Sequence, residues 1–280
     1  MPTSHADRTN VDKIAFIGGG NMACAILGGL LKRGMTASQF EVVEPFDGQR
    51  TKLMQQWGIQ AQAVPGPALD SAGLVVWAVK PQMFKDAARQ AKGHTRQALH
   101  FSVAAGVRSS SIAQWLDTER VVRAMPNTPA LIGKGITALF AREAVTEADR
   151  QMVNGVADTM GASLWLSDES QLNAVTALSG SGPAYVFYFI EAMMEAGLQM
   201  GLTRDQAHRL SVATFTGSSE LAAASSESPE TLRAQVTSKG GTTFAALNSL
   251  EQGGVKELFV QAMHKARDRA REMGEEFGSA

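Results

Sequence analysis

The chain has 280 residues, of which 44 % are hydrophobic and 19 % are charged, which is typical of a globular protein and excludes a disordered or fibrous one. Its 26 Lys and Arg residues nearly cancel its 27 Asp and Glu residues, leaving a net charge of −1. No strongly basic surface for nucleic acid or an anionic membrane is therefore expected, and a small-molecule ligand is favoured. The length is compatible with one or two domains.

The cysteine content and the N-terminal sequence indicate the cellular compartment of the protein. Cys24 is the single cysteine, which excludes an intramolecular disulfide and suits a reducing compartment. Residues 1–12 are polar and resemble a flexible end more than an export signal, and the sequence has no uncharged apolar run of about 18 residues. We expect a cytoplasmic protein with no membrane or nucleic-acid partner. The histidines are scattered without ligand-like spacing, so no metal site is expected.

The first half of the chain alternates short apolar runs with helical stretches. The runs lie at residues 13–17, 40–43, 74–79, 98–103 and 121–125. Nearly continuous apolar runs indicate strands covered by helices on both faces, so residues 13–167 predict an α/β domain with a doubly wound parallel sheet. Residues 135–140 and 163–166 are expected to extend this sheet at an edge.

Beyond residue 167 the apolar residues recur at helical spacing, which predicts an all-helical domain over residues 168–280. Thr203 with Gln206 forms a capping box, and Ser228 followed by Pro229 marks a second helix start. A last helix is expected from about residue 254 to residue 273. Its basic run at residues 264–271 is interpreted as a solvated face.

The most specific signal in the first half is a glycine-rich turn directly after the first predicted strand. Gly18, Gly20 and Ala23 match the pattern G-x-G-x-x-A between a strand and a helix. Gly18 permits the tight turn, and Gly20 lets a pyrophosphate approach the backbone next to Asn21 and Met22. The phosphates would lie at the helix N-terminus, where free N–H groups favour anions. The alternative is a glycine-rich turn without a ligand.

Glu44 ends the second predicted strand, where an acidic side chain usually binds the ribose hydroxyls of a dinucleotide. This position favours NADH, whereas Arg50 is the nearby candidate for the 2′-phosphate of NADPH, so both cofactors stay open. The alternative for Glu44 is a plain surface carboxylate.

Two further turns follow predicted strands at the ligand-binding edge of the sheet. Ala78, Val79, Lys80 and Pro81 leave the third strand, which places them near a cofactor. Asn127, in a stiff turn with prolines at 126 and 129, is a candidate to hydrogen-bond the nicotinamide ribose or amide together with its neighbouring threonine. The alternative is a rigid loop that serves only the fold.

Two small-residue segments occur in the helical half. Residues 178–183 interrupt a helix, so either a neighbouring helix or a ligand must approach the backbone there, and Ser181 is a candidate substrate contact. Residues 237–243 place Gly240 and Gly241 before an apolar helix, where consecutive N–H groups can form a nest for a carboxylate. Hydroxyls of Ser238, Thr242 and Thr243 would line that pocket, and the alternative is a simple capped loop.

Taken together these segments resemble the pyrroline-5-carboxylate reductase family from residue 13 to about residue 273. The order and spacing carry the resemblance, through the motifs FIGGGNMACAI, AVKPQ, RAMPNTPA, LSGSGPAY and VTSKGGTT. It implies a Rossmann-type domain followed by a helical dimerisation domain, at least a homodimer and often a decamer. It also implies reduction of 1-pyrroline-5-carboxylate to L-proline by NADPH or NADH, with dimerisation completing the site.

The resemblance further implies roles for individual residues. Thr243 would face the ring nitrogen of the substrate with Ser238 close by, as the catalytic pair. Gly240, Gly241 and Thr242 would bind the substrate carboxylate. One departure concerns Lys239, which stands where the family usually has proline, and it puts the rigidity of that loop in question.

Two other functions share part of this sequence pattern. A 3-hydroxyacid dehydrogenase shares the order of domains, but its Lys-x-x-Asn-Asn type pattern does not occur after residue 167. A cofactor-binding regulatory protein would need only the first domain. The Gly240-Gly241 nest argues against that rival, because a sensor of a dinucleotide needs no carboxylate pocket.

Overall fold

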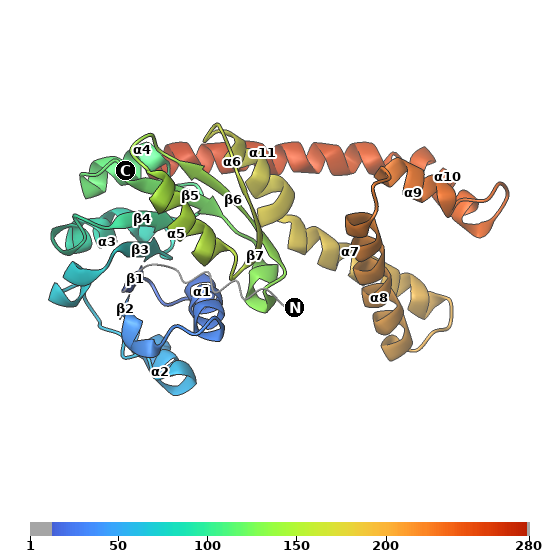
Figure 1. Ribbon diagram of the computed structural model, residues 1–280. Coiled ribbons are helices and arrows are strands. Elements are labelled where there is room, and N and C mark those ends of the chain that lie inside the picture. The colour runs from blue at the N-terminus through green and yellow to red at the C-terminus, as the bar shows by residue number, and fades with distance from the viewer. Residues whose placement is uncertain (1–12, 279–280) are drawn as a thin grey trace, which may run out of the picture. The chain divides into compact units, whose positions relative to one another are not determined.

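A computed structural model describes residues 13–278, so the flexible end expected at residues 1–12 lies outside the described part. The chain forms two compact units, Met1–Gly180 with Ala266–Ala280, and Ser181–Lys265 (Figure 1). The domain boundary near residue 167, expected from the change in sequence character, stays a prediction. By internal contacts the chain divides between Gly180 and Ser181.

The first unit is built on a seven-stranded sheet in the order β2-β1-β3-β4-β5-β6-β7. Its strands are β1 Ile14–Ile17, β2 Phe40–Val43, β3 Leu74–Trp77, β4 Leu99–Ser102, β5 Val121–Met125, β6 Gly135–Ala141 and β7 Gly161–Trp165. Strands β1 to β5 are mutually parallel, and β6 and β7 continue the sheet beyond β5, which confirms the predicted sheet and its edge extension.

The two edge strands run in the opposite direction, because β6 pairs antiparallel with β5 and β7 pairs parallel with β6. Residues 126–134 join β5 to β6, and this connection is shorter than the dozen or so residues that a parallel crossover requires. The sheet is therefore mixed, with a parallel part that carries the expected ligand edge.

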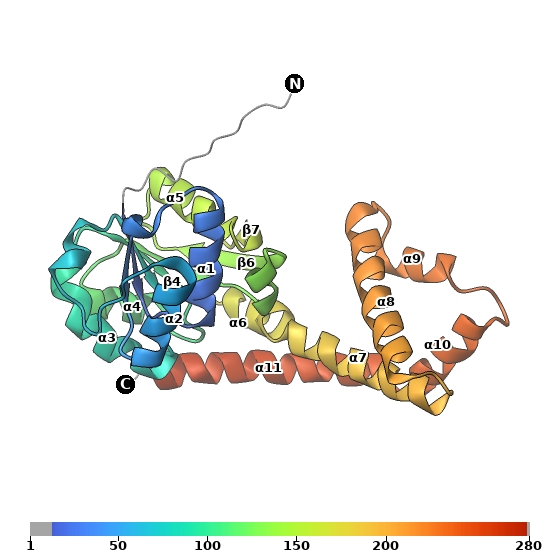
Figure 2. The ribbon, with the colours of Figure 1, turned by 90° about the horizontal axis from the view of Figure 1, so that it is seen from below.

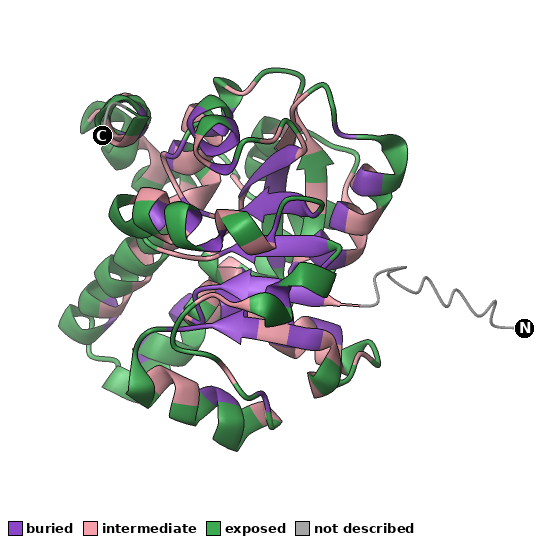
Figure 3. Cartoon of the chain, turned by 90° about the vertical axis from the view of Figure 1, so that its left-hand side faces the viewer, coloured by how far each residue is buried: buried purple, intermediate pink, exposed green. Residues whose placement is uncertain are grey.

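Helices cover both faces of the sheet, as expected for a doubly wound fold. Alternate residues of β1, β2, β3 and β5 enter one of two apolar clusters, one with α1 and α5 and the other with α3 and α4. Figure 3 shows the strands as a buried layer between helices with exposed outer faces. The helices are α1 Asn21–Lys32, α2 Asp47–Trp57, α3 Phe84–Ala91, α4 Ser109–Leu116, α5 Glu147–Ala157 and α6 Gln171–Val175.

Short helical turns complete the first unit. The 3-10 turns are η1 Ala37–Gln39, η2 Pro67–Ser71, η3 Pro81–Met83, η4 Lys92–His94 and η5 Thr128–Ile132, and a π-helical turn, η6, spans Thr176–Gly180. The end of α11, Val255–Gly278, also belongs here, since a Cβ added at Gly106 would meet Met273 at 3.3 Å and Phe277 at 3.4 Å. The helix is longer than the predicted 254–273.

The second unit is all-helical, with α7 Gly182–Gln199, α8 Arg204–Ala224, α9 Pro229–Gln235, α10 Thr242–Gln252 and the first part of α11. Thr203 and Ser228 cap α8 and α9 with their side chains, as predicted. Helices α7 and α8 pack together near their connecting turn, where a Cβ added at Gly197 would lie 3.0 Å from the Cβ of Ala207 (Figure 2).

Most apolar side chains of this second unit face outward. The exposed ones include Phe187, Tyr188, Leu210, Leu221 and Leu258, whereas both clusters of buried apolar side chains belong to the first unit. Exposed apolar side chains in this number indicate a protein interface. Within residues 13–278 no helix is both long enough and apolar enough to cross a bilayer.

Candidate functional site

The order β2-β1-β3 places a topological switch point between β1 and β3, and ligands of open α/β sheets bind at the carboxyl ends of strands at such a point. The glycine-rich turn lies there. Gly18 has φ 96°, and a Cβ on it would come within 2.6 Å of the Ala78 carbonyl oxygen. Only glycine fits, because the turn after β1 touches the backbone that leaves β3.

Gly20, the N-cap of α1, has the opposite surroundings. No atom lies within 4 Å of a Cβ built on it, so this side of the turn is open. The first turn of α1, which begins with Asn21 and Met22, has no side-chain cap and no acidic residue. Its free N–H groups and the helix dipole thus form a ready site for an anion, and the geometry fits a dinucleotide pyrophosphate. Ala23 is fully buried beneath the turn.

Glu44 is buried, with 5 % of its surface exposed, and is not a surface carboxylate. Its Oε2 accepts the Gly19 N–H at 2.8 Å and its Oε1 accepts the Phe46 N–H at 2.9 Å. Both carboxylate oxygens therefore already bind the backbone. The predicted contact of Glu44 with a ribose stays a prediction.

Arg50, the candidate for a 2′-phosphate, is also engaged. Its Nη1 donates to the carbonyl oxygens of Glu44 and Pro45 at 2.9 and 2.7 Å, and its Nη2 lies 2.9 Å from Asp47 Oδ1. The guanidinium fixes the corner where β2 ends and α2 begins.

Sequence reasoning missed Gln49, in the first turns of α2. Its Nε2 donates to the Gly19 carbonyl oxygen at 2.5 Å and lies 3.6 Å from Cys24 Sγ. The Cys24 thiol also points at the Gly19 carbonyl, at 3.4 Å, and burial raises its pKa. A polar residue near the start of the helix after Glu44 was the signal, but a helix start commonly carries polar residues for solvation alone.

The segment after β3 lies beside the glycine turn. The Ala78 N–H donates to the Ile17 carbonyl oxygen at 2.9 Å, which ties this segment to the end of β1. Lys80 is exposed and is the N-cap of η3, which begins with Pro81, while Val79 is half-buried. The ammonium group of Lys80 is thus available to a ligand at this edge.

Asn127 follows β5 and makes two defined contacts. Its Oδ1 accepts the Ile136 N–H at 3.0 Å, and its Nδ2 donates to Ser179 Oγ at 3.1 Å. These bonds tie the turn to β6 and to η6, as the rigid-loop alternative expects. The neighbouring Thr128 side chain is exposed and remains a candidate for contact with a ligand.

The close approach to the backbone that is expected within residues 178–183 occurs at Gly180. A Cβ there would overlap the side-chain end of Met125, so the last residue of β5 lies against the backbone at this position. Gly180 closes the π-helical turn η6, after which Ser181 begins the second unit as the N-cap of α7. Ser181 is half-buried and its side chain makes no N-cap hydrogen bond.

Residues 238–241 form a tight turn ahead of α10. The Gly241 N–H donates to the Ser238 carbonyl oxygen at 3.0 Å, and Gly240 has φ 75°, the signature of a type II turn with glycine at its third position. A Cβ on Gly241 would lie 2.6 Å from Ser238 Oγ, so a larger residue there would require the Ser238 side chain to move. Lys239 takes the second position of the turn, where proline is common.

Helix α10 starts at this turn with a glycine N-cap, as α1 does. Its first turn has no side-chain cap and no acidic residue, whereas Thr146, Thr203 and Ser228 cap α5, α8 and α9 with their hydroxyls. Within the described residues no hydrogen bond engages the hydroxyls of Ser238, Thr242 or Thr243. The predicted carboxylate nest therefore has both free N–H groups and free hydroxyls.

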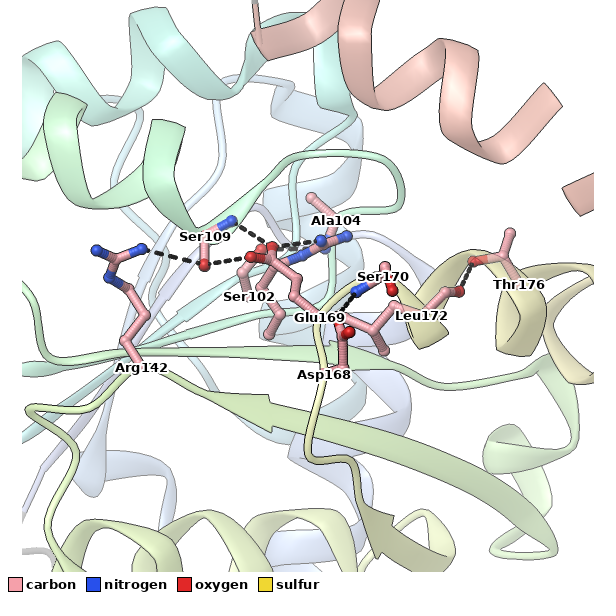
Figure 4. Close-up of polar contacts among 10 residues, drawn as sticks. Ser102, Ala104, Ser109, Arg142, Asp168, Glu169, Ser170, Leu172 and Thr176 are labelled. Atoms are coloured by element: carbon pink, nitrogen blue, oxygen red, sulfur yellow. Dashed lines mark hydrogen bonds and ion pairs between the residues drawn. The ribbon is translucent and has the colours of Figure 1, made fainter. Parts of the chain in front are cut away.

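One charged cluster near β5 was not anticipated. Arg123, mostly buried, pairs with Glu169 at 2.6 Å, and Glu169 also accepts from Ser109 (Figure 4). Burial alone would raise the pKa of Glu169, but the Arg123 charge and the Ser109 hydrogen bonds outweigh it and hold that pKa below its usual value. No group of three or more potential metal-binding side chains occurs within residues 13–278.

Comparison with known proteins gives the family. Residues 169–273 match the family described as pyrroline-5-carboxylate reductase dimerisation, and residues 13–106 match that described as NADP oxidoreductase, coenzyme F420-dependent. Pyrroline-5-carboxylate reductases of Pseudomonas aeruginosa and Pisum sativum are 40 % and 35 % identical to the chain, covering 95 % and 93 % of it and 98 % and 95 % of their own length. The chain belongs to the pyrroline-5-carboxylate reductase family. This confirms the resemblance found in the sequence.

Solved members of the pyrroline-5-carboxylate reductase family share the fold. The Coxiella burnetii protein has a TM-score of 0.86 at 37 % identity, with 94 % of this chain and 99 % of that chain covered. The Plasmodium falciparum protein, solved with NADP bound, has a TM-score of 0.85 at 26 % identity and covers 95 % of this chain and 99 % of its own. The predicted order of an α/β unit followed by a helical dimerisation region is thereby confirmed.

Proposed function

We propose that the protein is a pyrroline-5-carboxylate reductase, which reduces the C=N bond of 1-pyrroline-5-carboxylate to give L-proline, the last step of proline biosynthesis. Besides family membership, one structural observation carries the proposal. Helices α1 and α10 both begin at a glycine with uncapped N–H groups, one in each unit. The reaction needs two such anion sites, since the dinucleotide carries a pyrophosphate and the substrate carries a carboxylate.

The first anion site would hold NADPH or NADH. Gly18, Gly20, Asn21 and Met22 would receive the pyrophosphate, and the open space beside Gly20 supports this placement. Ala78, Val79, Lys80, Pro81 and Asn127 would line the remainder of the cofactor, along the carboxyl ends of β3 and β5. The NADP bound to the Plasmodium falciparum relative favours NADPH.

The second anion site would hold the substrate. Backbone N–H groups of Gly240, Gly241 and Thr242 would bind the carboxylate at the start of α10, with Ser181 as a further contact. The hydroxyls of Thr243 and Ser238 would then be free to face the ring. Of these groups, the Gly241 N–H already donates to the Ser238 carbonyl oxygen, whereas the N–H groups of Gly240 and Thr242 have no hydrogen-bond partner within the described residues.

The bound reduced nicotinamide would supply a hydride to the imine carbon. The Thr243 hydroxyl would hold a proton at the ring nitrogen, which makes the imine electrophilic, and Ser238 would assist it. The carboxylate nest would fix the ring in one orientation. Positioning of this kind can lower a barrier by roughly 7–11 kcal/mol in favourable cases, so strong acids or a metal are not required.

The outward apolar faces of the second unit support a homodimer, in agreement with the dimerisation family that this region matches. Further assembly into a decamer and a cytoplasmic location are parts of the same proposal.

The test is the loss of reduced nicotinamide absorbance with purified protein, NADPH or NADH, and 1-pyrroline-5-carboxylate, with L-proline measured as the product. We expect oxidation only when the substrate is present, with one proline formed for each cofactor oxidised. The reaction without substrate is the control. Tight cofactor binding without turnover would instead support the regulatory alternative.

A further inference from the structure

The peptide groups of Gly19, the middle glycine of the turn, are held from both sides by side chains. Glu44 Oε2 accepts the Gly19 N–H at 2.8 Å, and Gln49 Nε2 donates to the Gly19 carbonyl oxygen at 2.5 Å. A Cβ on Gly19 would lie 2.8 Å from Leu53 Cδ1 and 3.4 Å from the Cβ of Glu44. The turn is therefore pressed against β2 and α2 on its inner side, while its outer side at Gly20 stays open.

The two clamping side chains are themselves fixed to each other. Glu44 Oε1 accepts the N–H of Phe46, the N-cap of α2, and the Gln49 N–H donates to the Phe46 carbonyl oxygen at 3.1 Å. Arg50 locks the same corner through the carbonyl oxygens of Glu44 and Pro45. The end of β2, the start of α2 and the glycine turn thus form one closed hydrogen-bonded circuit.

We infer that Glu44 and Gln49 are positioning residues for the dinucleotide, which hold the Gly19 peptide so that Gly20 and the first N–H groups of α1 point toward the pyrophosphate. This rests on the proposed function, because it assumes that a dinucleotide is the ligand at α1. A glycine turn has many accessible conformations, and a preorganised turn binds with a smaller loss of entropy. This role differs from the usual role of an acidic residue after the second strand, which is to bind the ribose.

The two roles of Glu44, binding the ribose or holding the glycine turn, predict different preferences between NADH and NADPH. A carboxylate that accepts ribose hydroxyls favours NADH and repels the 2′-phosphate of NADPH. Glu44 is 5 % exposed and both its oxygens bind backbone N–H groups, so its charge is directed at the turn. Loss of the clamp should therefore weaken both cofactors by the same factor.

The decisive experiment compares Gln49→Glu, Gln49→Ala and the control Gln55→Ala. Glu has the shape of Gln but no donor for the Gly19 carbonyl, and Gln55 is an exposed residue on the same helix. The dissociation constants for NADPH and NADH are measured without substrate, by fluorescence of the bound nicotinamide. We expect both constants to rise about 5-fold in Gln49→Ala, the effect of one neutral hydrogen bond, and to stay unchanged in the control. In Gln49→Glu the added carboxylate also repels the pyrophosphate, so both constants should rise further.

Glu44→Gln is the second variant, with thermal melts to show that every variant is folded. We expect equal weakening of NADPH and NADH, and a KM for the cofactor that rises more than kcat falls. Tighter NADPH with weaker NADH would overturn the inference and assign Glu44 to the ribose. Wild-type affinity in both Gln49 variants would also overturn it. Because binding is measured without turnover, failure to reduce the imine refutes the proposed function alone, whereas wild-type protein that binds neither cofactor refutes both.

Discussion

Ser109 at the start of α4 donates both its backbone N–H and its hydroxyl to the carboxylate of Glu169, each at 2.6 Å, across a sequence separation of 60 residues. The helix has no side-chain cap from its own N-cap residue, Arg108. Glu169 therefore caps α4 from a distant segment, and it also neutralises the buried guanidinium of Arg123. A single carboxylate thus joins α4, β5 and the segment that enters α6.

Replacement of Glu169 by Gln should destabilise the protein by about 3 kcal/mol, because it leaves the Arg123 charge buried without its counterion. Urea unfolding at a fixed protein concentration measures this change. Glu143→Gln is the matched control, since Glu143 is an exposed glutamate of the same unit. Equal unfolding free energies for the two variants would contradict the role assigned to Glu169.

The same pair gives a pH dependence. The folded pKa of Glu169 lies below its ordinary value of 4.5, so the carboxylate binds fewer protons in the folded state. Its extra stabilisation is present above pH 4.5 and is lost as pH falls through the lower folded pKa. The difference in stability between wild type and Glu169→Gln should therefore shrink in acid, as measured by urea unfolding at several pH values.

The buried imidazole of His100 gives a second pH range in which the stability of the protein should change. Burial lowers the pKa of His100 from 6.5 to about 4, and the Arg120 charge lowers it further, while the hydrogen bond to the Thr95 carbonyl opposes the shift. The His100 Nδ1 accepts a hydrogen bond from Trp77 Nε1 at 3.0 Å. Because only the unfolded chain binds the proton between these values, stability should rise from pH 4 to pH 6.5 by up to about 1.4 kcal/mol per pH unit. Unfolding of His100→Gln should show a smaller slope. The exposed His264→Gln serves as control, and an unchanged slope in His100→Gln would contradict this assignment.

The sequence predicted the fold well because its signals are local. The apolar runs at residues 40–43 and 121–125 coincide with β2 and β5, and the caps at Thr203 and Ser228 are observed. The reversal of β6 and β7 was not predicted, since strand direction depends on the length and path of a connection. The buried cluster was missed because Glu169 and Ser109 are brought together only by the folded chain, although an arginine inside an apolar strand, Arg123, hinted at a buried partner.

The sequence named candidate site residues, but it did not predict the hydrogen bonds among them. Gly18 and Gly20 were identified from their spacing, because a strand, a turn and a helix leave little freedom in where glycine is needed. Glu44 was expected to face a ribose, yet its oxygens bind the backbone, and Gln49 carried no recognisable pattern. Which of several nearby acceptors a side chain uses depends on distances of a few tenths of an ångström, which spacing in a sequence does not determine.

Position 239 should accept proline, the residue that the family usually has there, and the protein should become more stable. The turn has glycine at its third position with φ 75°, and within the described residues no hydrogen bond uses the Lys239 N–H. Lys239→Pro should stabilise the protein by about 0.4–1 kcal/mol by restricting the unfolded chain. Lys239→Ala, which removes the charge without stiffening the loop, is the control. We expect a KM for 1-pyrroline-5-carboxylate that is lower in the proline variant than in the alanine variant, and equal values would mean that loop rigidity does not limit binding.

Thr243→Ala tests the proposed chemistry most directly. Thr243 is the second residue of α10, just beyond the glycine turn, and its hydroxyl has no hydrogen-bond partner in the described structure. If this hydroxyl holds the proton at the ring nitrogen, its loss should lower kcat about 100-fold while the NADPH dissociation constant stays unchanged. Thr243→Ser keeps the hydroxyl and should recover most of the rate, and Thr51→Ala, on the exposed face of α2, is the control. A KM increase without any change in kcat would place Thr243 in substrate binding alone, and unchanged turnover would remove it from the mechanism.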